Sequence, residues 1–188
     1  KEHYFKKKYN TLERFISYFY QVDLITNCAV SPADKVLEVG FGSGLVSNHL
    51  RKAGLNVTTC DFDPSLKPDV VADIRSLPFT DNNFKVVTAF EVLEHVIFED
   101  FSKALGELKR VSSKFVILSL PYRASFFELT LRLPLTRTLF NRGVLSFFVR
   151  FPWFFKGFHV SGQHHWEIDG YNYRLGKIKK TLQENFSN

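Results

Sequence analysis

The spacing of apolar residues changes near residue 35. Between Tyr9 and Ala29 apolar side chains recur every third or fourth residue, which predicts an amphipathic helix. From Lys35 onward, short apolar runs rich in Val, Ile, Leu and Phe alternate with helix-like segments. Runs without polar alternation are typical of parallel strands buried on both faces. The predicted strands are 35–39, 56–60, 69–72, 85–90 and 114–120.

The segments between these strands complete an α/β pattern. Helices are predicted at 45–53, at 98–111 and near the end of the chain at 175–185. Only six residues, PSLKPD, follow Asp63 before the third strand, so we expect a loop there and not a crossover helix. Alternating strands and helices predict a doubly wound, Rossmann-like parallel sheet. We expect one domain made of an N-terminal helix (1–30), a core (34–122), an insertion (123–160) and a C-terminal segment (161–188).

Composition narrows the class of protein. The 188 residues suffice for one core, and 23% charged residues is ordinary for a folded domain. No run of about 18 uncharged apolar residues occurs, and no apolar segment of a secretory signal follows the charged N-terminus. Two cysteines cannot form a disulfide framework, so we expect a cytoplasmic protein. The net charge of +6 favours anionic partners without identifying one.

The segment 126–158 differs in character from the core. It holds nine phenylalanines and five basic residues against one acid, and Pro134 and Pro152 interrupt it. We expect two or three short helices here. They would act as a lid over the active site or as a dimer contact. Alternatively, the basic and aromatic mixture would lie on an anionic membrane surface or bind single-stranded nucleic acid.

A glycine-rich turn carries the clearest chemical signal. The sequence VLEVGFGSG, residues 36–44, leads from the first strand of the sheet through three alternating glycines into a helix. Glycine tolerates positive φ and lets a ligand approach the backbone. The spacing is GxGxG, which is neither the dinucleotide pattern GxGxxG nor a phosphate-binding P-loop. Glu38 would repel a pyrophosphate but suits a cation or an ammonium group, although a turn without any ligand is the alternative.

Two further acids follow the next two strands. Asp61 ends the second strand, where an acid can accept hydrogen bonds from both ribose hydroxyls. Asp73 closes the third strand and can accept from an exocyclic amine, while Phe62 and Ile74 would pack against the faces of adenine. Three acids at successive strand ends predict a ligand with a ribose, an aromatic base and positive charge.

These segments resemble class I S-adenosylmethionine-dependent methyltransferases. The resemblance rests on VLEVGFGSG, TTCDFD, VVADIRSLPF, VVTAFEVLEH and ELKRVSSKFVILSLPY, and it is greatest to a mostly small-molecule branch with LEH after the fourth strand. It implies S-adenosylmethionine as cofactor and S-adenosylhomocysteine as product. Asp61 would hold the ribose and Asp73 and Ile74 the adenine. The residues implied to surround the methionine end are Glu38, Gly40, Phe41, Gly42, Gly44, Phe90 and Glu91. The family fold ends with an antiparallel strand hairpin, which we expect to lie outside this sequence.

The acceptor is less readily predicted, because methyl transfer from a sulfonium needs positioning more than any one catalytic group. His95, just after the fourth strand, is a catalytic candidate, and capping of the following helix is its alternative role. His164, His165 and Glu167 form a polar cluster, but adjacent histidines on an extended chain point in opposite directions, so we expect no metal site from them.

The sequence also limits the acceptor class. Neither an Asn/Asp-Pro-Pro-aromatic motif after the fourth strand nor a Pro-Cys nucleophile occurs, which disfavours methylation of nucleic-acid bases. We expect a small, hydrophobic acceptor and no stable nucleic-acid partner, with peripheral membrane contact through 126–158 as a further option. An RNA or protein methyltransferase, or a non-catalytic relative that binds the cofactor, remains the alternative. The oligomeric state is not predicted.

Overall fold

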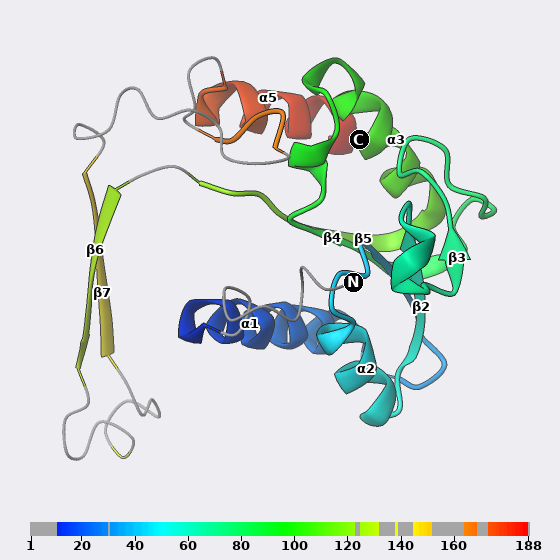
Figure 1. Ribbon diagram of the computed structural model, residues 1–188, viewed down its shortest axis with the longest axis horizontal. Coiled ribbons are helices and arrows are strands. Elements are labelled where there is room, and N and C mark those ends of the chain that lie inside the picture. Colours follow the sequence, from blue (N-terminus) through cyan, green and yellow to red (C-terminus); the bar gives the residue numbers. More distant parts are fainter. Residues whose placement is uncertain are drawn as a thin grey trace.

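A five-stranded parallel sheet forms the centre of the molecule (Figure 1). The computed structural model describes residues 11–29, 31–122, 125–131, 138, 145–151, 164–168 and 173–187. The strand order is β3-β2-β1-β4-β5, and each neighbouring pair is parallel. This confirms the predicted doubly wound α/β class. The strands are β1 (Lys35–Val39), β2 (Asn56–Asp61), β3 (Val70–Val71), β4 (Phe84–Phe90) and β5 (Ser112–Ser119).

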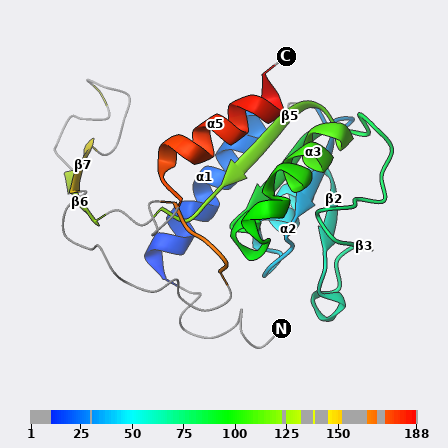
Figure 2. The same ribbon diagram turned by 90° about the horizontal axis from the view of Figure 1, so that it is seen from above.

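Helices cover both faces of the sheet (Figures 1 and 2). On one face Ile25 and Leu50 from two helices pack with Val36 and Val86 of the sheet. On the other face the core is larger and includes side chains from α3, α5 and residues 166–168. The helices and 3-10 turns are α1 (Leu12–Cys28), α2 (Leu45–Lys52), η3 (Pro64–Leu66), η4 (Leu93–His95), η5 (Phe98–Asp100), α3 (Phe101–Val111) and α5 (Leu175–Phe186). The predicted helices are therefore confirmed to within a turn at their ends.

The strand order places a switch point between β1 and β4. The chain runs from β1 outward to β2 and β3, then returns to the other side of β1 to form β4 and β5. The chain leaves the carboxyl end of β1 toward β2 and leaves the carboxyl end of β4 toward β5 on the opposite side. No single crossover connection therefore covers both carboxyl ends. In open α/β sheets this is where ligands bind.

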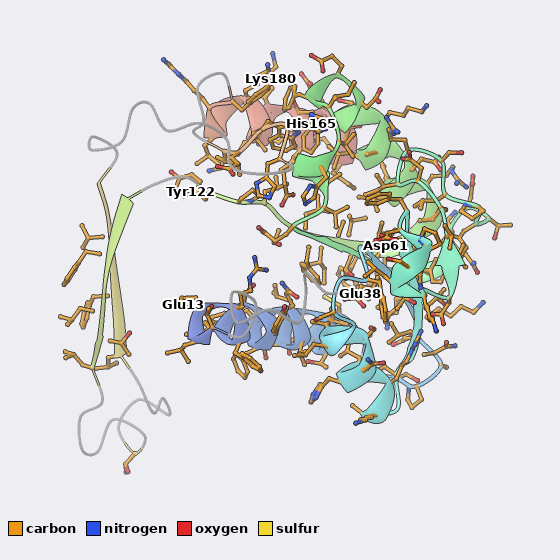
Figure 3. The ribbon with its side chains drawn as sticks, in the orientation of Figure 1. Glu13, Glu38, Asp61, Tyr122, His165 and Lys180 are labelled. Atoms are coloured by element: carbon orange, nitrogen blue, oxygen red, sulfur yellow. The ribbon has the colours of Figure 1, made fainter. Side chains whose placement is uncertain are left out.

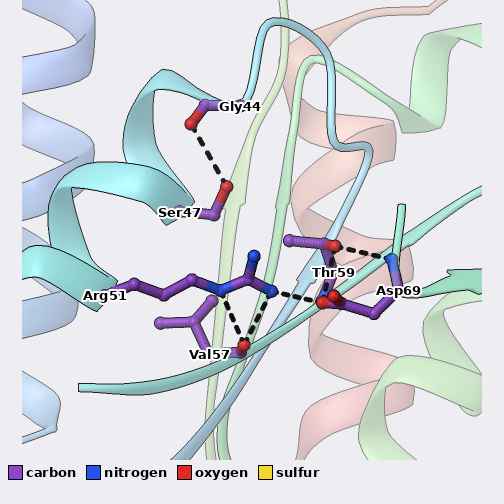
Figure 4. A network of polar contacts seen from close by, with 6 residues as sticks. All are labelled: Gly44, Ser47, Arg51, Val57, Thr59 and Asp69. Carbon is purple, nitrogen blue, oxygen red and sulfur yellow. Dashed lines mark hydrogen bonds and ion pairs between the residues drawn. The ribbon is translucent and has the colours of Figure 1, made fainter. Parts of the chain in front are cut away.

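The short connection after β2 is the expected loop. The six residues form only the single 3-10 turn η3, which is capped by the Asp63 carboxylate accepting from the Ser65 N–H at 2.8 Å. A network of hydrogen bonds and an ion pair stabilises this region (Figure 4). Arg51 donates to the Val57 carbonyl and to Asp69, and Asp69 accepts from the Thr59 N–H at 2.7 Å. These bonds tie α2 to the strand that ends in Asp61.

The prediction of short helices in 126–158 is wrong for residues 126–131 and 145–151, which form strands. Two strands, β6 (Ser125–Leu131) and β7 (Leu145–Phe151), pair antiparallel and form a separate two-stranded sheet. Aromatic residues are abundant in both segments and favour strands, whereas the two prolines lie outside the paired residues. In Figure 1 this ribbon stands apart from the parallel sheet.

The parallel sheet ends at β5 within the described residues, and β6 and β7 do not extend it. The expectation that the family's terminal hairpin lies outside this sequence stays a prediction, as does the division of 1–188 into a single domain with four parts. None of the helices in the described ranges is long and apolar enough to cross a bilayer.

Candidate active site at the carboxyl edge of the sheet

The glycine turn after β1 is built on backbone that few residues other than glycine adopt. Gly40, Gly42 and Gly44 have φ of 89°, 52° and 72°. A Cβ on Gly40 would lie 2.2 Å from Cγ2 of Val92, so the turn also packs tightly against the segment after β4. Gly44 is the N-cap of α2, which starts at Leu45. The sequence pattern therefore requires glycine for two physical reasons, left-handed backbone and close approach.

Glu38 lies buried beside this turn, with 5% of its surface exposed (Figure 3). Among the described residues its Oε2 atom has no hydrogen-bond partner. Burial raises the pKa of Glu38 to about 7, although Ser47 and the positive charge of Arg51 oppose that rise. A buried carboxyl group with an unsatisfied oxygen is costly unless a ligand completes it. The Oε2 atom of Glu38 is therefore available to accept a hydrogen bond or to pair with a cation.

Asp61 connects the end of β2 to the glycine turn. Its Oδ2 accepts the Phe41 N–H at 2.8 Å, and its Oδ1 accepts the Asp63 N–H at 2.9 Å. Each carboxylate oxygen can accept a second hydrogen bond, so this arrangement is compatible with ribose hydroxyls as donors. The neighbouring Phe62 is 76% exposed, unusual for a large aromatic side chain, and it lies at the same strand end. The structure therefore brings Phe41, Asp61 and Phe62 together.

Asp73 and Ile74 make more contacts within the protein than the sequence indicated. Both carboxylate oxygens of Asp73 accept from the guanidinium of Arg75, and this pairing lowers the pKa of Asp73. Arg75 also bonds Asp100 at 2.8 Å, which ties the segment to η5. Ile74 packs in the core and leaves little side chain to contact a base. The adenine-binding roles of both residues stay predictions.

Phe90 and Glu91 lie where β4 ends, at the switch point. Phe90 is half-buried, and Glu91 has φ of 55°, which is uncommon for a residue with a side chain. Three hydrogen bonds to Ser119 hold Glu91. Its N–H donates to the Ser119 carbonyl at 3.2 Å and to the Ser119 hydroxyl oxygen at 3.1 Å, and its Oε1 accepts from the Ser119 hydroxyl at 2.9 Å. Left-handed backbone of this kind is typical of functional sites.

A second buried acid, Glu94, was missed by the sequence interpretation. It is fully buried, and neither of its carboxylate oxygens has a hydrogen-bond partner within the described part of the chain. Burial raises the pKa of Glu94 to about 8, and the nearby charges of Glu91 and Glu167 add to this rise. The available signal was the spacing Glu-x-x-Glu-His immediately after a buried strand, where an apolar connection would otherwise be expected.

The expected polar cluster at 164–167 lies against this acid. The His165 N–H donates to the Glu94 carbonyl at 2.7 Å, and the Trp166 indole N–H donates to the Val96 carbonyl at 2.9 Å. The ring centroids of His95 and His164 are 4.9 Å apart. His95 is not the N-cap of the following helix, because α3 starts at Phe101 with Asp100 as its N-cap. A catalytic role of His95 stays a prediction.

Comparison with known proteins agrees with this geometry. Residues 37–118 match the family model described as a methyltransferase domain. The fold also matches solved structures, among them a SAM-dependent methyltransferase from Archaeoglobus fulgidus (TM-score 0.55, 15% identity, 92% of this chain and 68% of that one). A protein from Pyrococcus horikoshii OT3 aligns with a TM-score of 0.50 at 22% identity over 73% of this chain and 66% of its own. Residues 37–118 are therefore similar to a methyltransferase domain, and the solved structures share the fold of this chain.

Curated relatives match the same part of the chain. The demethylmenaquinone methyltransferase of Corynebacterium efficiens is 33% identical over 91 residues, which is 44% of this chain and 39% of the relative. The enzyme of the same name from Renibacterium salmoninarum is 35% identical over 91 residues, or 43% and 38%. This chain therefore matches about two fifths of the length of these relatives.

Proposed function

We propose that this chain binds S-adenosylmethionine at the carboxyl ends of β1, β2 and β4 and transfers its methyl group to a small hydrophobic acceptor of the quinone type. The observation that carries the cofactor assignment is Glu38, buried with an unsatisfied oxygen beside three left-handed glycines. A sulfonium nucleoside with an ammonium group supplies the positive charge and donors that this arrangement lacks. The relatives named as acting on demethylmenaquinone support the acceptor class.

In this proposal each strand end contributes one part of the site. Gly40, Phe41, Gly42 and Gly44 surround the methionine end with Glu38, and Phe90 and Glu91 approach it from β4. Asp61 accepts from the ribose and Phe62 covers one face of the adenine, while Asp73 and Ile74 line its edge. The protein's main catalytic task is then to hold the acceptor in line with the methyl group, since the sulfonium is already activated.

Substitution of the ribose acid tests the cofactor site. Asp61→Ala is expected to weaken binding of S-adenosylhomocysteine at least tenfold, because hydrogen bonds to a charged group are each worth roughly 1.5–3 kcal/mol. Calorimetry measures the affinity. Asp23→Ala, an exposed acid on α1, is the matched control and should leave the affinity unchanged. Equal affinity of the Asp61 variant and the control would refute the ribose assignment.

Labelled methyl donor tests the reaction itself. Incubation of the purified chain with a lipid extract containing demethylated quinones should give a labelled product that partitions into organic solvent. Parallel reactions contain RNA or cell protein in place of the lipid extract. Label appearing only there would favour the alternative acceptors, and no transfer to any of the three would indicate a non-catalytic relative. NAD should bind far more weakly than S-adenosylhomocysteine.

An apolar acceptor resides in membranes, and we propose that β6 and β7 contact the membrane surface. Phe127 pairs with Val149 and Leu129 with Phe147, so all four side chains share one face of the ribbon, and each is exposed. The surrounding segment 126–158 carries five basic residues and one acid. An exposed apolar face with a basic excess suits an anionic bilayer.

The membrane proposal predicts that the chain binds anionic vesicles and that this binding depends on the exposed apolar face of β6 and β7. The unmodified chain should sediment with phosphatidylglycerol vesicles, and combining Phe127→Ser, Leu129→Ser and Phe147→Ser should lower the bound fraction at least fivefold. The same substitutions should leave cofactor affinity intact, which shows that the core is folded. If the triple variant binds vesicles as well as the unmodified chain does, the ribbon is not the contact.

A further inference from the structure

Two histidines and a buried acid converge beside the end of β4. Glu94 and His95 belong to η4, whereas His164 comes from a segment about seventy positions later in the sequence. One nitrogen of each histidine and one carboxylate oxygen of Glu94 all lie within 4.8 Å of one another. The His164 Nε2 atom is 4.0 Å from Glu94 Oε1.

We propose that Glu94, His95 and His164 form a binding site for a divalent transition-metal ion. Two imidazole nitrogens and a carboxylate are a ligand set found in protein zinc sites, and imidazole favours zinc and its neighbours over magnesium or calcium. Ligand atoms bound about 2.1 Å from one tetrahedral ion are about 3.4 Å apart, so movements of roughly an ångström would complete the site.

The orientation of His164 is the second observation. Its Nδ1 atom is 2.7 Å from Glu167 Oε1, and Glu167 is itself buried. A carboxylate at Nδ1 places the ring proton there and leaves the Nε2 lone pair directed toward Glu94. Metal-binding histidines are commonly held by an acid in this way. Glu167 is therefore a positioning residue for the ion.

Burial of Glu94 is the third observation. A carboxyl group that is fully buried with neither oxygen hydrogen-bonded is expensive to maintain. The charge of Glu91 nearby increases this cost. A divalent cation would compensate both acids, whereas a proton on Glu94 would satisfy only one oxygen.

The backbone fixes the cluster before any ion binds. The His165 N–H to Glu94 carbonyl bond of 2.7 Å joins the two segments next to the ligands. Trp166, fully buried among Phe98, Phe101 and Tyr173, anchors the later segment on α3. The sequence argument against a metal considered only the adjacent His164 and His165. The fold instead pairs His164 with His95, which local spacing does not reveal.

Zinc titration of the purified full chain tests this site. After removal of metals with a chelator, calorimetry should show one Zn²⁺ bound per chain, and Co²⁺ should give visible absorption bands of a low-coordinate nitrogen and oxygen site. Glu94→Gln and His164→Ala should each weaken Zn²⁺ binding at least tenfold, and Glu167→Gln should weaken it by about tenfold.

His165→Ala is the matched control, because His165 is exposed, adjacent in sequence and outside the cluster, and its bond to Glu94 uses only backbone. It should stay within twofold of the unmodified chain. Equal effects of His164→Ala and His165→Ala, or no stoichiometric binding by the unmodified chain, would overturn the proposal. If Glu94→Gln fails to fold, melting temperatures with and without Zn²⁺ decide the question. Zn²⁺ should raise the melting temperature of the unmodified chain and of His165→Ala more than that of His164→Ala. These experiments measure metal binding alone, so their outcome does not depend on whether the chain binds the proposed cofactor.

Discussion

Gly40→Ala is expected to weaken binding of S-adenosylhomocysteine at least a hundredfold. The added Cβ would lie 2.2 Å from Cγ2 of Val92, far inside van der Waals contact, and φ of 89° is unfavourable for alanine. The turn must therefore move, and the Phe41 N–H would then shift away from Asp61, to which it is bonded at 2.8 Å. Since the turn positions several proposed cofactor contacts at once, the loss exceeds that of any single side chain.

Gly54→Ala separates the two causes of this effect. Gly54 has φ of 91°, almost the same as Gly40, but a Cβ there meets no atom within 4 Å. It should lower stability by about 1–2 kcal/mol from backbone strain and leave cofactor affinity unchanged. Adding Val92→Ala to Gly40→Ala removes the methyl group that clashes and should recover part of the affinity. Calorimetry with S-adenosylhomocysteine and thermal melting measure both quantities, and normal binding by Gly40→Ala alone would contradict the role of the turn.

The parts predicted from sequence are those encoded locally. Buried parallel strands are continuous apolar runs, so the sheet, its glycine turn at 40–44 and the loop after Asp63 follow from neighbouring residues. The same logic placed Glu38 and Asp61 at one edge of the sheet, because the carboxyl ends of parallel strands lie together. These predictions depended on no contact between distant segments.

The errors arise where pairing is distant in sequence. Strand β6 is separated from its partner β7 by thirteen residues, and nothing within Ser125–Leu131 specifies that partner. The aromatic content was compatible with helix or strand until the pairing was known. Glu94 was missed for a related reason, since its significance depends on His164, which the fold brings to it from the C-terminal segment.

The two proposed sites share one physical cause. Glu38 and Glu94 are buried acids with unsatisfied oxygens at the ends of adjacent strands, β1 and just beyond β4. Both proposals imply that stability is sacrificed at these acids in favour of a ligand. The stability that each buried acid costs should therefore be measurable when that acid is replaced.

Glu38→Gln is expected to stabilise the chain at pH 8 while weakening cofactor binding roughly ten- to hundredfold. Burial raises the pKa of Glu38 from the ordinary value of 4.5 to about 7. The folded chain holds this proton more tightly than the unfolded chain, so the contribution of Glu38 to stability falls as pH rises from about 4.5 to about 7 and stays low above that range. The penalty at pH 8 is on the order of 3 kcal/mol, and glutamine avoids it.

The pH dependence of the stability difference distinguishes this cause from a general packing effect. Below pH 4.5 Glu38 is neutral in both states, so the variant and the unmodified chain should have similar stabilities. The difference should grow through pH 7 in favour of glutamine, as urea unfolding at several pH values measures. Cofactor binding should change in the opposite sense, because the variant lacks the negative charge that the sulfonium nucleoside requires. A variant that is destabilised equally at every pH, or that binds the cofactor normally, would show that Glu38 is a structural residue and not a ligand.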